Sequence, residues 1–307
     1  MIYMNNNKLN IEKLIKEISG GAVDAETSCI RVSGKDAKNF LQGQLTNDIE
    51  DISEETYQIS SFLTNQGKVI AILRVIKTEN GYLILTNKEI TKYFIEKISI
   101  YILNSDVTIN IEDNFLVYGV LNDTSEELIE KLNINKQLGC TKFNEENIWI
   151  LNNSTKQFHS IIIVSMTKLN EEKINFKKSC QNILMLTDIL RKYLRLNDSN
   201  KERYIPQVLN LDMLNGINFK KGCYTGQEIV ARTHYLGKVK KKIFLISSKE
   251  NSFEINEKIY NQDNELLGEI IFSSIQINNL YFSLAVIKID TNSDKLLSKN
   301  IPINIIC

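Results

Sequence analysis

The hydrophobic pattern of the chain changes at Gly237, and this change constrains the fold more than any other feature of the sequence. Before it, runs typical of strands are mixed with stretches whose apolar residues recur at helical spacing. After it, short apolar runs are separated by polar turns, and no helical pattern of any length follows. The first part predicts an α+β fold. The second predicts a small β-barrel or sandwich, with strands at 239–247, 257–260, 265–273 and 279–289.

The strands and helices before Gly237 follow from the same periodicity. Strands are expected at 28–32, 57–63, 68–77, 82–86, 106–111, 115–121, 147–151 and 158–165. Helices are expected from Ala37 to about Leu45, over 88–103, from Thr124 to about Leu132, and in the stretch that ends at Arg195. Polar turns at 64–67 and 79–81 join neighbouring strands, so these strands are expected to run antiparallel. Residues 196–222 contain Pro206 and several Asn, Asp and Gly, and they predict a loop.

The length of 307 residues is too great for one small core and indicates two or three packed domains. We expect an N-terminal α+β lobe at 1–114 and a second α+β lobe at 115–236. These two lobes are expected to intertwine as one unit. The C-terminal β-barrel is expected at 237–307.

The composition is that of an ordinary globular protein, with 43% hydrophobic and 24% charged residues. The 37 basic and 37 acidic side chains cancel, so the chain has no overall field that would attract nucleic acid or an anionic membrane. A local patch is still compatible with this balance. The N-terminal residues do not resemble a signal peptide, and no apolar run approaches the ~20 residues of a membrane helix. A cytoplasmic protein without membrane contact is expected.

The chain has five cysteines, at 29, 140, 180, 223 and 307. Their odd number and wide spacing argue against a disulfide framework in a reducing compartment. There is no Cys-x-x-Cys pair, and the only histidines are His159 and His234. A self-contained metal or iron–sulfur site is therefore not expected.

One cysteine lies in an unusual segment. Cys223 stands between Gly222 and Gly226, and Lys220 and Lys221 directly precede Gly222. If a helix begins near Thr225, the sulfur lies close to its positive end, and with the two lysines this would favour the thiolate. A thiolate could attack an electrophile, bind a metal or form a mixed disulfide. From spacing alone, a cysteine packed as a small hydrophobe is an equally good interpretation, and for the other four cysteines it is the better one.

The segment Lys-Gly-Cys-Tyr-Thr-Gly-Gln-Glu at 221–228 resembles the signature of the YgfZ family, relatives of the glycine-cleavage aminomethyltransferases. The resemblance extends upstream to Tyr204-Ile205-Pro206-Gln207 and downstream to Arg232 and Gly237. A second block, Phe40 to Asp48 with Gly34-Lys35-Asp36 before it, is similar to the N-terminal motif of the family. The two blocks stand in the expected order, so the resemblance covers most of the chain.

The resemblance implies a three-lobed ring of the aminomethyltransferase type, with tetrahydrofolate or a related reduced folate in a central channel. It also implies support of iron–sulfur enzymes, including a tRNA methylthiolation enzyme. Cys223 corresponds to the key functional residue of the family. The motif and pocket residues that go with it are Lys221, Gly222, Tyr224, Thr225, Gly226, Gln227, Glu228 and Arg232.

The chain departs from its enzyme relatives after Gly67. True aminomethyltransferases carry a pair of aspartates there, whereas this chain reads Gly67-Lys68-Val69-Ile70-Ala71-Ile72. The acid–base group for methylene transfer is absent from this stretch. We do not expect an aminomethyltransferase, and an accessory role is favoured over catalytic turnover.

A second departure concerns folate. Some close relatives have tryptophans at the positions of Thr27 and Leu184, and the acidic residue that holds the pterin is matched here only if Asp188 replaces it. Stacking on an aromatic ring contributes roughly 0.5–1.5 kcal/mol beyond burial. Folate is therefore expected to bind more weakly than in those relatives.

The segment 220–242 has seven basic residues and one acidic residue, Glu228. The basic residues are Lys220, Lys221, Arg232, Lys238, Lys240, Lys241 and Lys242. It could be a solvated face, a site for the polyglutamate tail of folate or a site for RNA phosphates. Two functions remain: a folate-binding accessory factor for iron–sulfur enzymes of tRNA modification, or a direct RNA-binding module that uses this segment. Trp149 lies in an alternating strand and is expected in the core.

Overall fold

The computed structural model describes residues 18–131, 139–143, 148–166, 183–250, 252–277, 279–289 and 296–306. Within them, an N-terminal antiparallel sheet has the order β3-β4-β5-β2-β6. Its strands are β2 (Thr27–Ser33), β3 (Tyr57–Leu63), β4 (Val69–Thr78), β5 (Gly81–Asn87) and β6 (Thr108–Ile111). The helices α2 (Ala37–Gln44) and α3 (Lys88–Ser99) pack against it, and a short 3-10 turn (Ile49–Asp51) follows α2. The central strand β4 is buried on both faces, as its continuous apolar run predicts.

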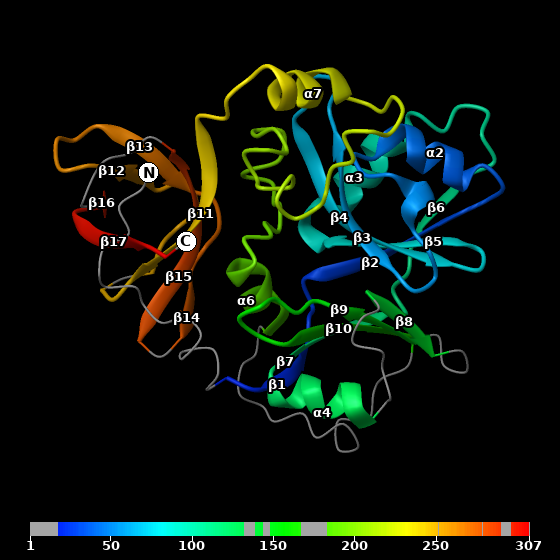
Figure 1. Cartoon of the computed structure of the whole chain (residues 1–307), viewed down its shortest axis with the longest axis horizontal. Coiled ribbons are helices and arrows are strands. Elements are labelled where there is room, and N and C mark those ends of the chain that lie inside the picture. The colour runs from blue at the N-terminus through cyan, green and yellow to red at the C-terminus, as the bar shows by residue number, and fades with distance from the viewer. Residues whose placement is uncertain are drawn as a thin grey trace.

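A second antiparallel sheet has the order β1-β7-β10-β9-β8. Its strands are β1 (Gly20–Val23), β7 (Leu116–Leu121), β8 (Cys140–Phe143), β9 (Ile148–Asn152) and β10 (Ser160–Ser165). The helix α4 (Asp123–Lys131) covers its outer face (Figure 1). One buried cluster contains Leu83 and Leu85 of the first sheet together with Trp149 and Ile162 of the second. The two sheets therefore share a core, and Trp149 lies in it as the sequence predicts.

The ranges 1–114 and 115–236 exchange elements. Strand β1 comes early in the chain but pairs with β7 of the second sheet, with Gly20 opposite Leu121. The later segment around α7 (Gln227–Tyr235) packs on the first sheet, where Gly226 meets Gly67. Each of the two sheet units thus contains a piece of chain from the other range.

The C-terminal strands close into a barrel. Strand pairing runs β11-β17-β16-β12-β13-β15 and returns from β15 to β11, while β14 is added to β15. The strands described here are β11 (Lys241–Ser248), β12 (Lys258–Tyr260), β13 (Leu266–Ile270), β14 (Ile275–Ile277), β15 (Leu280–Lys288), β16 (Leu296–Ser298) and β17 (Ile301–Ile305). Closure confirms the prediction of a small β-barrel and excludes the open sandwich, because the pairing returns to its first strand.

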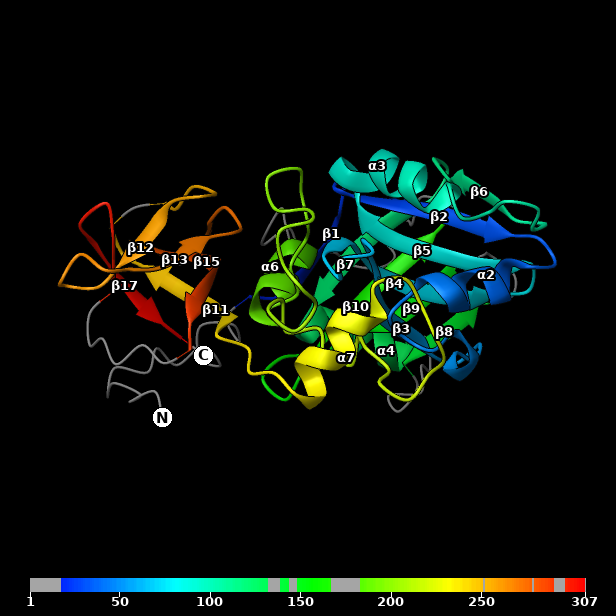
Figure 2. The ribbon, with the colours of Figure 1, turned by 90° about the horizontal axis from the view of Figure 1, so that it is seen from above.

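A central segment, residues 183–218, lies between the barrel and the two-sheet unit (Figures 1 and 2). It begins with α6 (Ile183–Leu190) and continues as loop, as predicted for 196–222. The Asn200 side-chain amide donates to the carbonyl oxygen of Ile271 in the barrel at 2.9 Å. On the other side, the Val69 N–H of β4 donates to the carbonyl oxygen of Tyr204 at 2.9 Å. The molecule is three-lobed about this segment, which confirms the expected α+β architecture.

Two predicted helices end earlier than expected. The helix expected over 88–103 ends at Ser99, because the chain turns there and leaves Leu103 87% exposed with a φ of +46°. The helix expected to end at Arg195 stops at Leu190, and Lys192 takes a φ of +57°. This turn brings Arg195 back toward α6. Within the described ranges, no helix is long and apolar enough to cross a membrane.

Candidate functional site

The Cys223 loop, residues 219–226, leads into α7 at the surface of the first sheet unit, and Cys223 is exposed in it. The helix begins after Gly226, which has a φ of +79°. A Cβ at Gly226 would come within 2.5 Å of the Thr64 carbonyl oxygen, so only glycine fits there. Gly67, with a φ of +70°, closes the facing turn. Two glycines thus allow the start of α7 to lie directly on the 64–67 turn.

Lys221 anchors the loop from inside. Its ammonium nitrogen donates to the backbone carbonyl oxygens of Gln42, Leu45 and Asn47 at 2.7, 2.8 and 2.9 Å. These carbonyls lie at the C-terminal end of α2, where backbone acceptors lack intrahelical partners. Burial lowers the pKa of Lys221 to about 8, so it remains mostly protonated at neutral pH. The sequence motif predicted that the charge of Lys221 would act on the Cys223 thiol, but in the structure its ammonium group binds carbonyl oxygens at the end of α2.

The remaining motif residues hold the same junction together. Tyr224 is buried, with a 5.2 Å distance from the Lys221 nitrogen to the centre of its ring. The Thr225 hydroxyl donates to the side-chain oxygen of Gln44 at 2.9 Å, and its N–H donates to the Gly43 carbonyl at 3.2 Å. The block at 40–48 and the block at 221–228, far apart in sequence, are therefore in direct contact.

The outer side of the loop is open. Gly222 is exposed, and a Cβ built on it would have no neighbour within 4 Å. Gln227 is the first residue of α7, and its N–H donates to the Tyr224 carbonyl oxygen at 3.1 Å. Further along α7, Glu228 and Arg232 form an exposed ion pair of 2.8 Å. A partner can therefore approach Cys223 without displacing a core residue.

Two other described cysteines lie in the core. Cys29 is 3% exposed and Cys140 is 1% exposed. Burial raises the pKa of each thiol to about 12, which keeps both in the unreactive thiol form. The prediction that these two are structural is confirmed. Cys180 and Cys307 lie outside the described residues.

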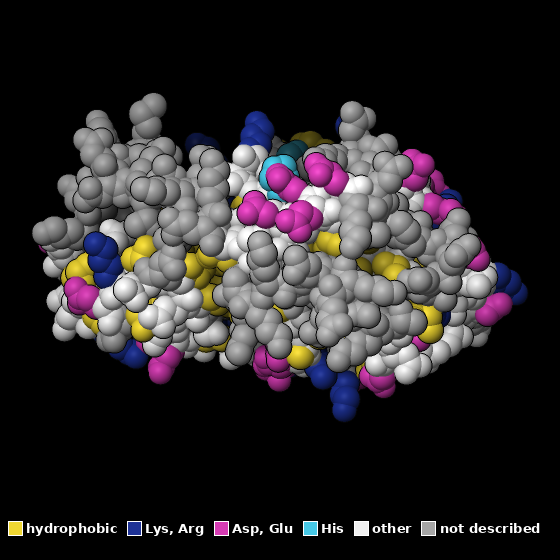
Figure 3. Space-filling model, turned by 90° about the horizontal axis from the view of Figure 1, so that it is seen from below, with side chains coloured by type: hydrophobic (Ala, Val, Ile, Leu, Met, Phe, Trp, Pro, Cys, Tyr) yellow, Lys and Arg dark blue, Asp and Glu magenta, His cyan; other side chains and the backbone are white. Residues whose placement is uncertain are grey.

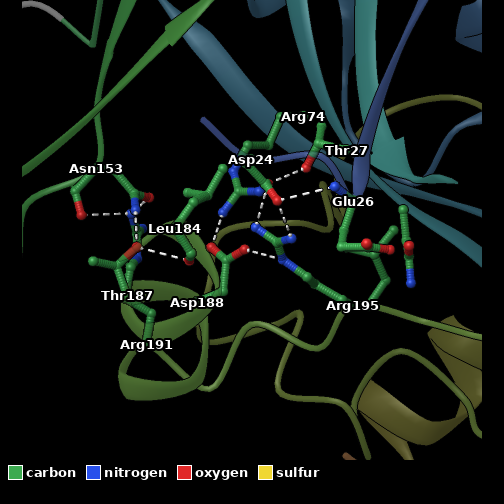
Figure 4. Close-up of polar contacts among 12 residues, drawn as sticks. Asp24, Glu26, Thr27, Arg74, Asn153, Leu184, Thr187, Asp188, Arg191 and Arg195 are labelled. Carbon is green, nitrogen blue, oxygen red and sulfur yellow. Dashed lines mark hydrogen bonds and ion pairs between the residues drawn. The ribbon is translucent and has the colours of Figure 1, made fainter. Parts of the chain in front are cut away.

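A buried ionic cluster lies at the centre of the molecule (Figure 4). Arg74 of β4 and Arg195 each donate to one carboxylate oxygen of Asp188 on α6. Arg195 also binds Asp24 through two hydrogen bonds of 2.8 and 3.1 Å. The four side chains are between 1% and 9% exposed. The cluster therefore joins β4, the central segment and the β1–β2 connection.

Other groups support these charges. The Arg74 guanidinium carbon lies 3.9 Å from the ring centre of Tyr193, a cation–π contact. Burial opposes the charge of Asp24, but Arg195 outweighs burial and holds the pKa of Asp24 below its usual range. The Arg74 Nε is buried and has no hydrogen-bond partner among the described residues. Apart from the Arg74 Nε, the charged groups of the cluster thus have hydrogen-bond or ion-pair partners.

The two positions expected to contact folate fall near this cluster, but only one of them faces a space. Thr27 donates its hydroxyl proton to Asp24 at 2.6 Å and lines a cavity with Arg74, Tyr193 and Arg195. The cavity is about 10 Å³, roughly the room for one water molecule. Leu184 is 2% exposed, packs against Gly119 of β7 and does not line the cavity.

The cluster includes Arg74 in the middle of β4, whereas the Cys223 loop contacts the turn before β4. Gly226 contacts Gly67, and Arg74 follows Gly67 by seven residues along an extended chain. At ~3.3 Å a residue, Gly67 and Arg74 are separated by at most roughly 23 Å, because Gly67 lies in the turn before the strand. Arg74, Arg195 and Asp24 were not predicted as site residues. A lone arginine within the otherwise apolar start of β4 was the available signal, because a buried arginine needs a partner.

A substitution at Lys221 tests the anchor. Lys221→Met keeps the aliphatic volume but leaves the carbonyl oxygens of Gln42, Leu45 and Asn47 without their common donor. We expect a loss of about 2–3 kcal/mol in the free energy of unfolding. Lys220→Met, at the exposed neighbouring position, should change it by less than about 0.5 kcal/mol. Equal urea midpoints for the two variants would show that the anchor does not stabilise the fold.

No family model matches the chain. A protein of Colwellia psychrerythraea named tRNA-modifying protein YgfZ is 29% identical over 256 residues, which cover 80% of this chain and 76% of the relative. The protein of the same name from Aliivibrio fischeri is 31% identical over 225 residues, covering 71% and 68%. That from Buchnera aphidicola of Baizongia pistaciae is 30% identical over 214 residues, covering 68% and 67%.

Among solved structures, the glycine cleavage system aminomethyltransferase T from Bartonella henselae has a similar fold. The TM-score is 0.75, and the match covers 99% of this chain and 89% of the other. The sequences are only 11% identical, so this similarity concerns the fold alone. It agrees with the three-lobed architecture described above.

Proposed function

The chain belongs to the YgfZ family of tRNA-modifying proteins, and on that premise we propose that it is an accessory factor for iron–sulfur enzymes of tRNA modification. The clients we propose include a tRNA methylthiolation enzyme. The protein would act in the cytoplasm, where those enzymes and their tRNA substrates meet. Cys223 would supply the chemical contact between the protein and its client.

The observation that carries this proposal is the construction of the Cys223 loop. Two sequence blocks that are far apart, 40–48 and 221–228, meet at Lys221 and Thr225. Their junction presents one exposed thiol, whereas Cys29 and Cys140 are buried. An exposed thiolate can bind the iron of a partner's cluster or exchange with a partner's cysteine. Both reactions serve an iron–sulfur enzyme and need a thiol that a second protein can reach.

Folate is the cofactor that the family resemblance implies, and the central cavity is where it would bind. The residues present do not fit a pterin ring in the arrangement described. The cavity has room for about one water molecule, whereas ligand pockets commonly enclose ~300–1,000 Å³. Asp188, the carboxylate expected to replace the pterin-binding residue, already binds Arg74 and Arg195. We therefore assign no chemical step to a bound folate.

Weak folate binding is the expected result. Tetrahydrofolate must open the ionic cluster, and neither Thr27 nor Leu184 offers a ring for stacking. The affinity should be at least about tenfold lower than in a family relative with both tryptophans. Lengthening the polyglutamate tail should raise the affinity in a salt-sensitive way, because the added carboxylates are anionic. Calorimetry with mono- and polyglutamyl tetrahydrofolate measures this, and an affinity equal to that of the relative would contradict it.

The proposed function is tested in a bacterium from which the gene of its own family member has been deleted. The full chain should restore the level of methylthiolated nucleosides in hydrolysed tRNA, measured by mass spectrometry. An empty vector provides the baseline. Expression of the folded chain without any rise above that baseline would overturn the proposal.

A further inference from the structure

A group of aromatic rings covers the exposed end of α7. The rings of Phe219 and His234 are stacked with centroids 3.7 Å apart and an angle of 15°. The Tyr235 ring meets His234 edge-on at 4.7 Å and is itself 65% exposed. Leu236, the next residue, is 85% exposed. The stack connects the start of the Cys223 loop to the end of α7, and it leaves one aromatic ring facing solvent.

Exposed lysines flank these rings along the chain: Lys220 follows Phe219, Lys238 follows α7, and Lys240 and Lys241 stand where the barrel begins. Lys220, Lys238, Lys240 and Lys241 are exposed, and none of them has an ion-pair partner among the described residues. Two other cations of the segment are paired, Arg232 with Glu228 and Lys242 with Asp212. We use the name α7 face for the group formed by Phe219, Lys220, residues 232–236, Lys238, Lys240 and Lys241. The basic segment of the sequence therefore offers at least four free cations there.

One group of acidic residues lies on another part of the surface. Helix α4 carries Asp123, Glu126, Glu127 and Glu130, and it lies at the opposite end of the molecule from α7 (Figure 1). Seen from that end, acidic side chains form a group on the surface (Figure 3). The net charge is zero, but acidic and basic side chains are unevenly distributed over the surface. A polyanion would be attracted to the α7 face and repelled from the α4 face.

We propose that the α7 face binds single-stranded RNA. An exposed aromatic ring among unpaired cations matches the way proteins hold single strands, in which bases stack on rings and phosphates contact lysines. An acidic protein surface would form ion pairs with the lysines, but it has no bases to stack on the exposed Tyr235 ring. The inference rests on the proposed function only for the choice of RNA as the polyanion.

The test uses the full chain and a labelled single-stranded RNA of about 15 nucleotides, with binding followed by fluorescence anisotropy. A plot of the logarithm of the association constant against the logarithm of the salt concentration has a slope of about −0.7 for each phosphate contact to a single strand. If all four free lysines contact phosphates, we expect a slope of about −3. A variant with Lys220, Lys238, Lys240 and Lys241 replaced by Ala should lose most of this slope. The matched control replaces four other exposed lysines by Ala and so removes the same amount of charge; they are Lys77, Lys88, Lys156 and Lys249. It should keep the slope.

Substitutions at Tyr235 distinguish RNA binding from the binding of other polyanions. Tyr235→Ala should weaken RNA binding by roughly tenfold without changing the salt slope, and Tyr235→Phe should keep the affinity. The proposal is overturned if Tyr235→Ala is neutral and polyglutamate competes as well as RNA, since the face would then suit an acidic protein. Equal losses in the two four-lysine variants would also overturn it. RNA binding is measured on the purified chain and the proposed function by rescue in cells, so either proposal can fail while the other holds.

Discussion

Replacing Asp188 by Ala should lower the free energy of unfolding by about 3–5 kcal/mol, because it removes one member of a buried ionic cluster. The carboxylate accepts from Arg195 at 2.8 Å and also from Arg74, and it is 1% exposed. Without it, two buried guanidinium groups lose their shared partner. Asp24 could compensate for Arg195 only, since the described contacts of Asp24 do not include Arg74.

Urea unfolding followed by the fluorescence of Trp149 measures this loss. Trp149 is the only tryptophan of the chain and lies in the core that the two sheets share. The matched control is Asp198→Ala, which removes an exposed carboxylate paired with Lys201 at 2.6 Å. That pair is on the surface, so the control should cost less than about 1 kcal/mol. A cost for Asp188→Ala as small as the control would mean that the cluster does not hold the lobes together.

Much of the fold could be predicted because its main elements have strong periodic patterns. Strand β3 has the predicted bounds, and the ends of β4 and β5 are within one residue of prediction. Strand β1 was missed because Gly20 to Val23 is too short to show a pattern, and its pairing with β7 depends on tertiary contact. Strands β16 and β17 were missed for the same reason.

The candidate site was predictable in part. The motif at 221–228 marked Cys223, and the structure presents that residue at the surface. The partner of Lys221 could not be predicted, since it bonds to Gln42 at a separation of 179 residues. The ionic cluster was hidden for a similar reason: Arg195 and Asp24 are 171 residues apart and meet only because α6 ends early. Local spacing identifies a motif, but it does not show which distant group neutralises a charge.

Replacing Cys223 by Ser should abolish rescue in cells that lack their own family member, while leaving the fold intact. Serine differs from cysteine in one atom, and position 223 is exposed, so stability should change by less than about 0.5 kcal/mol. A hydroxyl cannot form a mixed disulfide and is a poor ligand for cluster iron. The loss should therefore come from chemistry and not from packing.

The matched controls are Cys29→Ala and Cys140→Ala. Both remove a buried thiol of a kind that burial keeps unreactive. Alanine is chosen over serine because a hydroxyl buried without a partner destabilises the core by about 1–3 kcal/mol. Both controls should rescue to nearly the level of the unchanged chain. Thermal unfolding of all three purified variants verifies that each is folded.

The most direct measurement is the amount of methylthiolated nucleoside in tRNA from cells carrying each variant, determined by mass spectrometry and normalised to protein level. We expect wild-type amounts with Cys29→Ala and Cys140→Ala, and amounts equal to the empty vector with Cys223→Ser. Wild-type amounts with folded Cys223→Ser would contradict the claim that this exposed thiol performs the function.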